Sequence, residues 1–217
     1  MTRIKICCIA NIDEAELAIK CGADAIGLVS AMPSGPGVID FETITEISNA
    51  VTGRIDTFLL TSKRTTTEII DQLKNCKTPT VQICDSLISG SYLDIKKELP
   101  EVKIVQVIHV VDESSVDEAI EAAKTAEALL LDSGNQKLAV KELGGTGRTH
   151  NWELSRKIVD GVTIPVYLAG GLNPANVKEA IETVHPFGVD ICSGLRTEGK
   201  LDEAKLSEYV KLVKACS

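Results

Sequence analysis

The sequence predicts an α/β fold, a single-domain (β/α)8 TIM barrel over residues 1–217. Short runs of Val, Ile, Leu and Ala alternate with longer segments of helical periodicity, which is typical of βα units around a parallel sheet. Polar and glycine signals follow strands one, six, seven and eight, whereas an open doubly wound sheet would concentrate them at one crevice. Eight units in 217 residues leave about 27 residues each, compact for a barrel of typically about 250, so the loops must be short.

The expected strands are short, aliphatic and bounded by turn residues. They are Ile4–Cys8, Ala25–Ser30, Asp56–Leu60, Thr80–Ile83, Lys103–Ile108, Ala128–Asp132, Pro165–Ala169 and Val189–Cys192. The expected helices have apolar residues at helical spacing. They are Asp13–Lys20, Phe41–Asn49, Thr66–Asn75, Tyr92–Glu98, Ser115–Ala123, Asn151–Val159, Pro174–Thr183 and Asp202–Ala215. Asn173-Pro174 fits an N-cap followed by a first-turn proline, and Cys21-Gly22 fits a glycine C-cap.

The composition excludes several classes of function. A net charge of −8 and 3% aromatic residues argue against a nucleic-acid surface. No apolar run approaches the roughly 20 residues that cross a bilayer, so we expect a cytoplasmic protein without a membrane partner. Seven scattered cysteines without metal-ligand spacing predict reduced thiols and no metal. A small-molecule ligand is favoured.

Acid-base candidates stand at the ends of two expected strands. Cys7 falls near the end of the first, and Asp132 closes the sixth. All strand C-termini of a parallel barrel open onto one face, so these two side chains are expected to meet over one substrate. The alternative for Cys7 is a small buried hydrophobe, the commonest role of a cysteine in a strand.

Glycines after the last two strands predict an anion site. Gly170-Gly171 and Ser193-Gly194 each end a strand and precede a helix, where exposed backbone N–H groups bind anions. Barrels often hold phosphate in the loops after strands seven and eight. Glycine that only makes a turn is the alternative.

Taken in order, six segments of the chain resemble the phosphoribosylanthranilate isomerase family of tryptophan biosynthesis, of which this chain would be a divergent member. The likeness extends nearly end to end. The segments are Lys5-Ile6-Cys7, Cys21-Gly22-Ala23-Asp24-Ala25, Leu131-Asp132-Ser133, Gly144-Gly145-Thr146-Gly147-Arg148-Thr149 with Trp152, Ala169-Gly170-Gly171-Leu172-Asn173-Pro174, and Val189-Asp190-Ile191-Cys192-Ser193-Gly194.

The resemblance implies a cofactor-free and metal-free Amadori rearrangement of a phosphorylated sugar, an aldose-ketose isomerisation. By position, Asp132 matches the general acid and Cys7 the general base. An ordinary cysteine, with a pKa near 8.5, is mostly protonated at neutral pH, so the site must stabilise or generate its thiolate. Phosphate would bind at Gly145, Gly147, Gly170, Gly171, Ser193 and Gly194. Further substrate contacts would come from Lys5, Gln82 and Arg148.

Other residues near the expected site have structural interpretations. Cys8 stands where the family usually has glycine, and strand alternation should turn it toward the helices. Lys5 should share the inward face with Cys7 and form an ion pair with Asp190. We expect Cys21, Cys76 and Cys216 to pack and His109 and His185 to be structural, whereas His150 is a candidate for substrate contact.

The loop after the second strand departs from the family pattern. Family members usually carry an arginine there that receives the anthranilate carboxylate, but in Ser30–Val38 the aligned place falls near Gly37. A buried carboxylate without a cation would cost several kcal/mol. Possible substitutes are Arg64, Arg148 and Arg196. Further departures are Gln82-Ile83-Cys84-Asp85 after strand four and Gln106-Val107-Ile108-His109 on strand five.

These departures keep two other hypotheses open. One is a related isomerase that acts on a different aminated or phosphorylated sugar. The other is a non-catalytic barrel that binds a sugar phosphate. The sequence leaves monomer and homodimer equally open.

Overall fold

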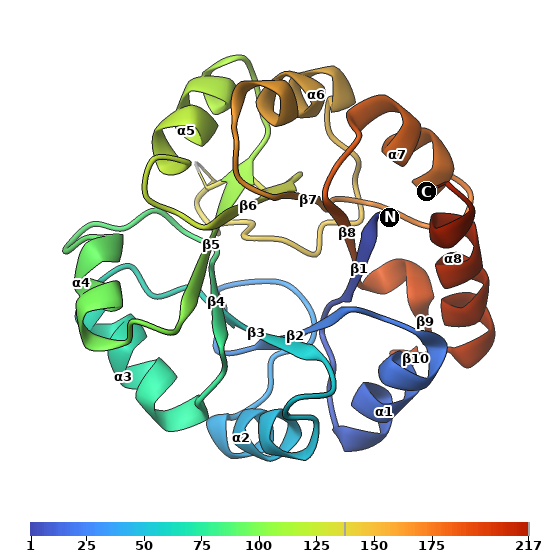
Figure 1. The fold of residues 1–217 in the computed structure, drawn as a ribbon, viewed down its shortest axis with the longest axis horizontal. Helices are drawn as coiled ribbons and strands as arrows, with labels where there is room; N and C mark the ends of the chain where they lie inside the picture. Colours follow the sequence, from blue (N-terminus) through green and yellow to red (C-terminus); the bar gives the residue numbers. More distant parts are fainter. Residues whose placement is uncertain (137, 217) are drawn as a thin grey trace.

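A computed structural model describes residues 1–136 and 138–216. Eight parallel strands form a closed barrel, and the pairing of the first strand with the eighth, with Lys5 opposite Asp190, completes the ring (Figure 1). The predicted barrel is confirmed, and the open sheet is excluded. The strands are β1 (Arg3–Ile6), β2 (Ala25–Val29), β3 (Asp56–Thr61), β4 (Thr80–Ile83), β5 (Lys103–His109), β6 (Ala128–Asp132), β7 (Val166–Leu168) and β8 (Gly188–Ile191).

Helices form the outer layer around the strands (Figure 1). They are α1 (Ile12–Cys21), α2 (Phe41–Ala50), α3 (Thr66–Cys76), α4 (Tyr92–Glu98), α5 (Ser114–Ala122), α6 (Trp152–Gly161), α7 (Val177–Val184) and α8 (Glu203–Ala215). Several begin at a residue whose side chain accepts a first-turn backbone N–H, as Asn11 does from Glu14 at 2.9 Å. The predicted C-cap at Gly22 is confirmed: its φ is 91°, and its N–H donates to carbonyls of the last turn.

Two differences from the predicted elements lie after β7 and after β8, and a third, the end of β1 at Ile6, concerns Cys8 at the barrel mouth. α7 is regular from Val177 rather than from Pro174, and residues 174–176 form a turn that leads into it. Asn173 caps this turn, because its Oδ1 accepts the Ala175 N–H at 2.9 Å and its carbonyl accepts the Val177 N–H at 3.0 Å. After β8 the chain forms a short 3-10 helix, η1 (Ser193–Leu195), and an antiparallel hairpin, β9 (Arg196–Thr197) and β10 (Lys200–Leu201). Segments of two or three residues carry no periodicity, so the sequence did not predict them.

Alternate residues of each strand supply two cores. Along β3, Leu59 packs among the strand-to-helix residues, whereas Phe58 and Leu60 belong to the cluster inside the barrel. Phe58 meets Tyr167 of β7 edge to face, with ring centroids 5.9 Å apart. The side chains of this inner cluster therefore fill the barrel below the strand C-termini.

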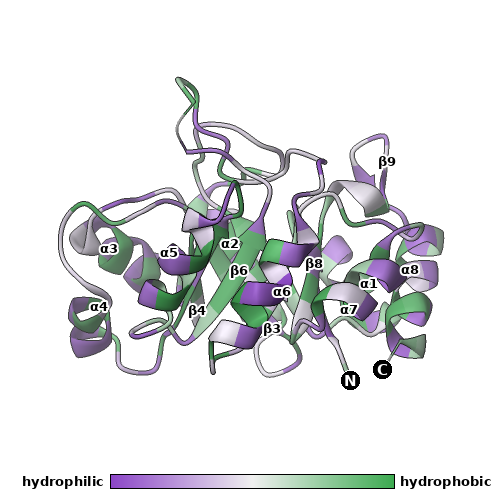
Figure 2. Ribbon diagram, turned by 90° about the horizontal axis from the view of Figure 1, so that it is seen from above, coloured by the Kyte–Doolittle hydropathy of each residue, from purple (hydrophilic) through white to green (hydrophobic). Residues whose placement is uncertain are grey.

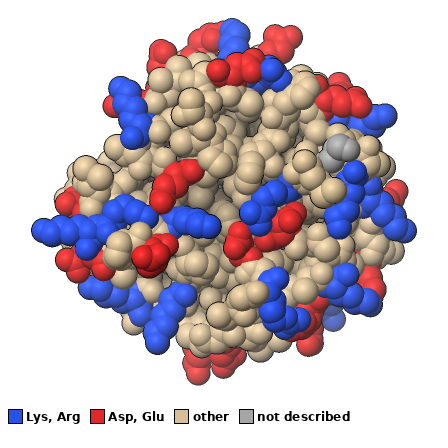
Figure 3. Space-filling model, in the orientation of Figure 1, with Lys and Arg blue, Asp and Glu red and all other residues tan. Residues whose placement is uncertain are grey.

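The two ends of the barrel differ. The chain termini lie at one end, and the longest loops rise from the other, at the strand C-termini (Figure 2). The face seen in Figure 3 has basic and acidic side chains interspersed. Where β1 and β3 begin, Arg3 Nη2 lies 3.0 Å from Asp56 Oδ2. Among the described residues, no helix is both long enough and apolar enough to cross a membrane.

Candidate active site

The ends of β1 and β6 open into one cavity at the barrel mouth. It holds about 720 Å³ of empty space, part of it open to solvent, and both Cys7 and Asp132 line it. Their exposed fractions are 7% and 8%. The Cys7 N–H donates to the Ile191 carbonyl at 2.8 Å, which continues the pairing with β8 past the end of β1. The fold thus brings the two acid-base candidates to one cavity, as expected.

A glycine on β2 makes room for the side chains at the end of β1. A Cβ on Gly27 would lie 3.0 Å from Cys7 Sγ and 3.2 Å from Lys5 Nζ, so both side chains reach the same space. Lys5 is fully buried, and its Nζ lies 2.9 Å from Asp190 Oδ1, which confirms the predicted ion pair. Burial disfavours the Lys5 charge, but the Asp190 carboxylate and the nearby sulfurs of Cys7 and Cys8 together outweigh burial and raise the pKa of Lys5. Lys5 therefore places a paired cation beside Cys7.

The two carboxyl oxygens of Asp132 have different surroundings. Oδ1 accepts the Ser133 N–H at 2.7 Å, and Ser133 Oγ lies 2.6 Å from Thr146 Oγ1 in the glycine-rich loop. Oδ2 faces Gly144, where an added Cβ would lie 2.9 Å away. Within the described part of the chain, Oδ2 has no hydrogen-bond partner. Oδ2 is therefore the oxygen left for a ligand.

Backbone amides at the ends of β7 and β8 form the candidate anion site. Gly170 and Gly171 have φ values of 81° and 62°, which favour glycine. In residues 1–136 and 138–216, the N–H groups of Gly170, Gly171, Ser193 and Gly194 donate no hydrogen bond. Because α7 begins only at Val177, the Gly170 and Gly171 amides belong to a turn, whereas Ser193 and Gly194 begin the 3-10 helix η1. Successive free amides still form an anion-binding concavity.

The cavity lining includes most of the predicted phosphate residues. Gly145, Gly147, Gly170, Gly171 and Ser193 line it, and Gly194 does not. A Cβ on Gly194 would instead lie 2.8 Å from the Leu172 carbonyl oxygen, so this glycine lets the loops after β7 and β8 approach closely.

Cys8 corrects one expectation. It was expected to face the helices, but β1 ends at Ile6, so strand alternation does not extend to it. Cys8 has a φ of 62°, lines the cavity, and points its Sγ toward the Pro36 carbonyl oxygen at 3.6 Å. This left-handed conformation favours glycine, the residue that the family usually has here.

The two departures from the family pattern touch each other. A Cβ on Gly37 would lie only 2.4 Å from Cys8 Cβ and 3.0 Å from Cys8 Sγ. The Cys8 side chain therefore occupies the space that any side chain at position 37 would need. An arginine at position 37 and a cysteine at position 8 exclude each other in this backbone.

The predicted substrate-contact residues are placed differently from one another. Gln82 of β4 lines the cavity, and its Oε1 is buried without a partner among the described residues. Lys5 is enclosed beneath the cavity by its pair with Asp190. Arg148 lies outside the lining, with a 60% exposed side chain paired with Glu142. Of these three side chains, only Gln82 faces the cavity.

The remaining arginine and histidine candidates have protein partners. Arg196 holds both carboxylate oxygens of Glu14 at 2.9 Å. His109 Nε2 lies 3.0 Å from the Cys84 carbonyl oxygen, and His150 Nε2 lies 2.8 Å from Ser155 Oγ. Burial lowers the pKa of His150 to about 4, so its ring is neutral at neutral pH.

Sequence reasoning missed several residues of the mouth. Cys84 and Cys192 line the cavity, and burial raises the pKa of Cys84 to about 12, so its thiol is inert. Lys141 reaches the strand-four end from the loop after β6, and Ser34 Oγ donates to its carbonyl at 2.7 Å. The hydrogen bond joins the loops after β2 and β6 above the barrel. Neither loop has a periodic pattern in the sequence. The only feature from which this part of the mouth could have been predicted is Asp85, which follows the end of β4.

Comparison with known proteins agrees with this geometry. Residues 4–212 match the family model described as N-(5′-phosphoribosyl)anthranilate (PRA) isomerase. The N-(5′-phosphoribosyl)anthranilate isomerase of Methanocella arvoryzae is 32% identical over 215 residues, covering 99% of each chain. Isomerase 2 of Methanosarcina mazei is 36% identical over 214 residues, covering 98% of this chain and 94% of its own.

Solved structures of the same family have the same fold. Phosphoribosyl anthranilate isomerase of Thermotoga maritima superposes with a TM-score of 0.80 at 28% identity, covering 99% of this chain and 100% of its own. Another phosphoribosyl anthranilate isomerase, solved in complex with reduced 1-(o-carboxyphenylamino)-1-deoxyribulose 5-phosphate, gives 0.78 at 26% identity with the same coverage. The chain therefore belongs to the N-(5′-phosphoribosyl)anthranilate isomerase family.

Proposed function

We propose that the chain converts N-(5′-phosphoribosyl)anthranilate into 1-(2-carboxyphenylamino)-1-deoxyribulose 5-phosphate, with Asp132 as general acid and Cys7 as general base. The observation that carries this proposal is the single cavity lined by both side chains and by the free amides after β7 and β8. The sugar phosphate lies against those amides, which brings C1 and C2 of the ribose between Cys7 and Asp132.

Asp132 performs the first half of the reaction. Its Oδ2, which has no partner in the described structure, carries a proton and gives it to the furanose ring oxygen. The C1–O bond breaks with its electron pair on that oxygen, and the nitrogen lone pair forms the C1=N bond of an iminium. The products of this step are an open-chain iminium and an Asp132 carboxylate.

Cys7 performs the second half. Its thiolate removes the C2 proton, and the C–H electron pair forms C1=C2 while the C1=N pair returns to nitrogen, giving an enolamine. The enolamine then becomes the ketone as C1 gains a proton and C2–OH loses one, and the Cys7 thiol returns its proton to the Asp132 carboxylate through solvent, which restores both groups. The buried Gln82 Oε1 is an acceptor available to a ribose hydroxyl during these steps.

The test is turnover of N-(5′-phosphoribosyl)anthranilate, followed by the loss of substrate fluorescence. Cys7→Ala and Asp132→Asn should each lower kcat by about 10² to 10⁴. Cys216→Ala, on a thiol at the end of α8, and Asp117→Asn, on α5, remove the same groups away from the cavity and should change kcat little. If both Cys7→Ala and Asp132→Asn fold and keep the turnover of the parent, the assignment is contradicted.

One observation favours a second candidate function. The loop Ser30–Val38 has no basic residue, and Cys8 fills the space beside Gly37. An isomerase of another aminated sugar phosphate, whose amine part lacks a carboxylate, would need no cation there. Turnover of such a substrate by protein that does not convert the anthranilate compound would favour this candidate. A folded protein that binds sugar phosphates without turnover would be a non-catalytic barrel.

The proposed partners are a phosphorylated sugar and a second copy of the chain. A family member from Thermotoga maritima is described as dimeric, which favours a homodimer over a monomer. Light scattering on the purified protein measures the molar mass, which distinguishes a monomer from a homodimer.

A further inference from the structure

The geometry points to a carboxylate-binding site between Arg64 and Lys141, at the side of the mouth away from the phosphate amides. It would receive the carboxylate on the aromatic part of the substrate in place of the arginine that the loop after β2 lacks. This inference rests on the proposed function.

A second hollow lies next to the main cavity. Two residues, Met32 and Leu143, line both, so the spaces adjoin. The rest of the second lining is Ala31, Pro33, Ser62, Arg64, Asp85 and Lys141. Its lining comes from the loops after β2, β3, β4 and β6, whereas the phosphate amides follow β7 and β8. An elongated ligand anchored at the amides can therefore pass Cys7 and Asp132 and end here.

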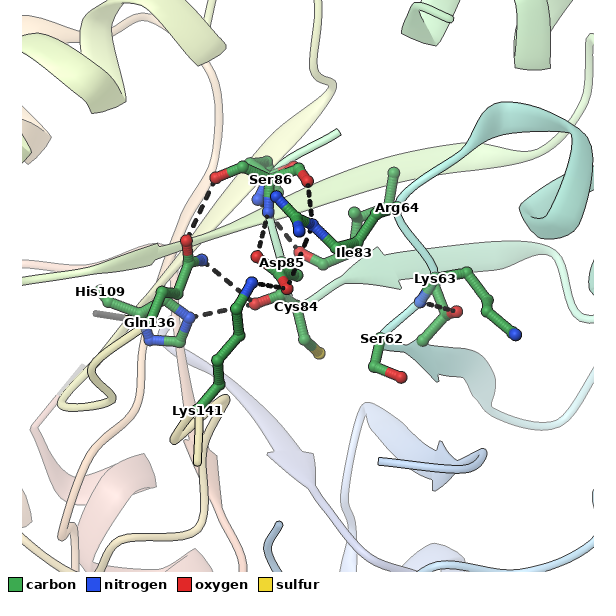
Figure 4. A network of polar contacts seen from close by, with 12 residues as sticks. Ser62, Lys63, Arg64, Ile83, Cys84, Asp85, Ser86, His109, Gln136 and Lys141 are labelled. Carbon is green, nitrogen blue, oxygen red and sulfur yellow. Dashed lines mark hydrogen bonds and ion pairs between the residues drawn. The ribbon is translucent and has the colours of Figure 1, made fainter. Parts of the chain in front are cut away.

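The charges of the second hollow do not balance. Asp85 is 2% exposed, and its Oδ2 lies 2.5 Å from Lys141 Nζ and 3.4 Å from Arg64 Nε (Figure 4). Asp85 Oδ1 accepts the Ser86 N–H at 2.8 Å. Two cations thus share one carboxylate, which leaves a net charge of +1 where the hollow meets the substrate cavity. A second carboxylate would complete the cluster, whereas Asp85 alone needs only one partner.

Arg64 has donors to spare. Its Nε donates to the Ser86 carbonyl at 3.1 Å, which fixes the side chain over the end of β4. In the described residues, its two terminal nitrogens have no partner, and the side chain is 39% exposed. A guanidinium edge of this kind binds a carboxylate through two parallel hydrogen bonds. The neighbouring Lys63 is neutralised by Glu68 at 3.0 Å and adds no charge.

The other arginines proposed from the sequence are less suited. Arg196 is 12% exposed at its side chain and fully engaged with Glu14. Arg148 lies outside both linings. Of the three, only Arg64 combines free donors with a place in a hollow that adjoins the site.

The experiment compares two substrates that differ only in the carboxylate, N-(5′-phosphoribosyl)anthranilate and N-(5′-phosphoribosyl)aniline. Arg64→Gln and Lys141→Gln should raise KM for the first about tenfold to a hundredfold, the loss expected for a hydrogen bond to a charged group. They should leave kcat, and both constants for the aniline compound, within about twofold. Lys63→Gln is the matched control and should change neither substrate.

Lys141→Gln also removes a partner of buried Asp85, so its thermal unfolding is measured alongside. Arg64→Lys keeps the charge but loses the planar guanidinium, so its KM for the anthranilate compound should lie between those of the parent and Arg64→Gln. This comparison does not depend on whether Lys141→Gln folds. Equal KM changes for both substrates, or no change for either, overturn the inference.

Failure of the proposed function is separable from failure of this inference. If the parent converts neither compound, calorimetry with reduced 1-(o-carboxyphenylamino)-1-deoxyribulose 5-phosphate and its carboxylate-free analogue replaces turnover. The site is supported if the parent binds the carboxylate form more tightly than the analogue and Arg64→Gln removes this difference in affinity. Equal binding of the two forms by the parent overturns it.

Discussion

Replacement of Gly37 by alanine tests the contact between the two departures from the family pattern. The new Cβ would meet Cys8 Cβ at 2.4 Å, well inside van der Waals contact, and Gly37 has a φ of 79°. The contact should cost about 1–3 kcal/mol as overpacking. The left-handed backbone should cost a further 1–2 kcal/mol or so. We therefore expect Gly37→Ala to lower the free energy of unfolding by about 2–5 kcal/mol.

Two further variants separate these contributions. Cys8→Gly removes the Cβ and Sγ contacts and leaves only the Cα of residue 8 at 3.0 Å, so Gly37→Ala in that background should lose mainly the backbone part, about 1–2 kcal/mol. Gly53 has a φ of 74° and nothing within 4 Å of its added Cβ. Gly53→Ala therefore measures the backbone cost alone, without a clash.

Urea unfolding at a constant m-value measures all the variants. The interaction energy of the Gly37→Ala and Cys8→Gly cycle should be about 1–3 kcal/mol. A Gly37→Ala penalty that is the same in the parent chain and in the Cys8→Gly background would refute the reasoning. If the contact is as described, Cys8→Gly with Gly37→Arg can then accept the arginine of the family, which Gly37→Arg alone cannot.

Other expected outcomes concern buried charges. Lys5→Met should lower the free energy of unfolding by about 3–5 kcal/mol, because it leaves Asp190 uncompensated, and Lys5→Met with Asp190→Leu should recover most of that loss. A double variant as unstable as the sum of the two single ones would contradict the pairing. Burial lowers the pKa of His150 from 6.5 to about 4, so the unfolded chain takes up a proton there before the folded one does. The free energy of unfolding should therefore fall by about 3 kcal/mol through this group as the pH falls from 6.5 to 4. His150→Gln should show a smaller fall over that window in urea titrations at each pH, and an unchanged fall would contradict it.

The barrel could be predicted from the sequence because its signals are local and repeated. A short aliphatic run such as Ala128–Asp132 indicates a buried strand, and a glycine such as Gly22 indicates the end of a helix. The handedness of the fold then follows from the alternation of strands and helices, and its closure was predicted because polar and glycine signals follow strands one, six, seven and eight. The positions of Cys7 and Asp132 at the mouth needed only the rule that parallel strands end on one face.

The rest of the mouth depends on contacts between loops that are far apart in sequence. Nothing near Cys8 indicates that its side chain meets Gly37, because the contact is made only when the loop after β2 folds back over the end of β1. Lys141 lies 56 residues from Asp85, in an aperiodic loop, and only the folded chain brings the two together. Sequence periodicity identifies helices and strands, whereas these two residue pairs are contacts between loops.

The end of the mouth that is proposed to bind phosphate and the end that is proposed to bind the carboxylate have different hydrogen-bond donors. At one end the free donors are peptide N–H groups, which every residue except proline supplies, so a substitution there removes no donor group, although a Cβ on Gly171 would lie 2.6 Å from the Arg148 backbone and displace it. At the other end the donors are the side chains of Arg64 and Lys141, and one codon change removes either. Under the two proposals, a site built this way keeps its phosphate donors when a substitution changes the donors for the group on the amine. New substrates in such a barrel should therefore differ at the amine and share the phosphate.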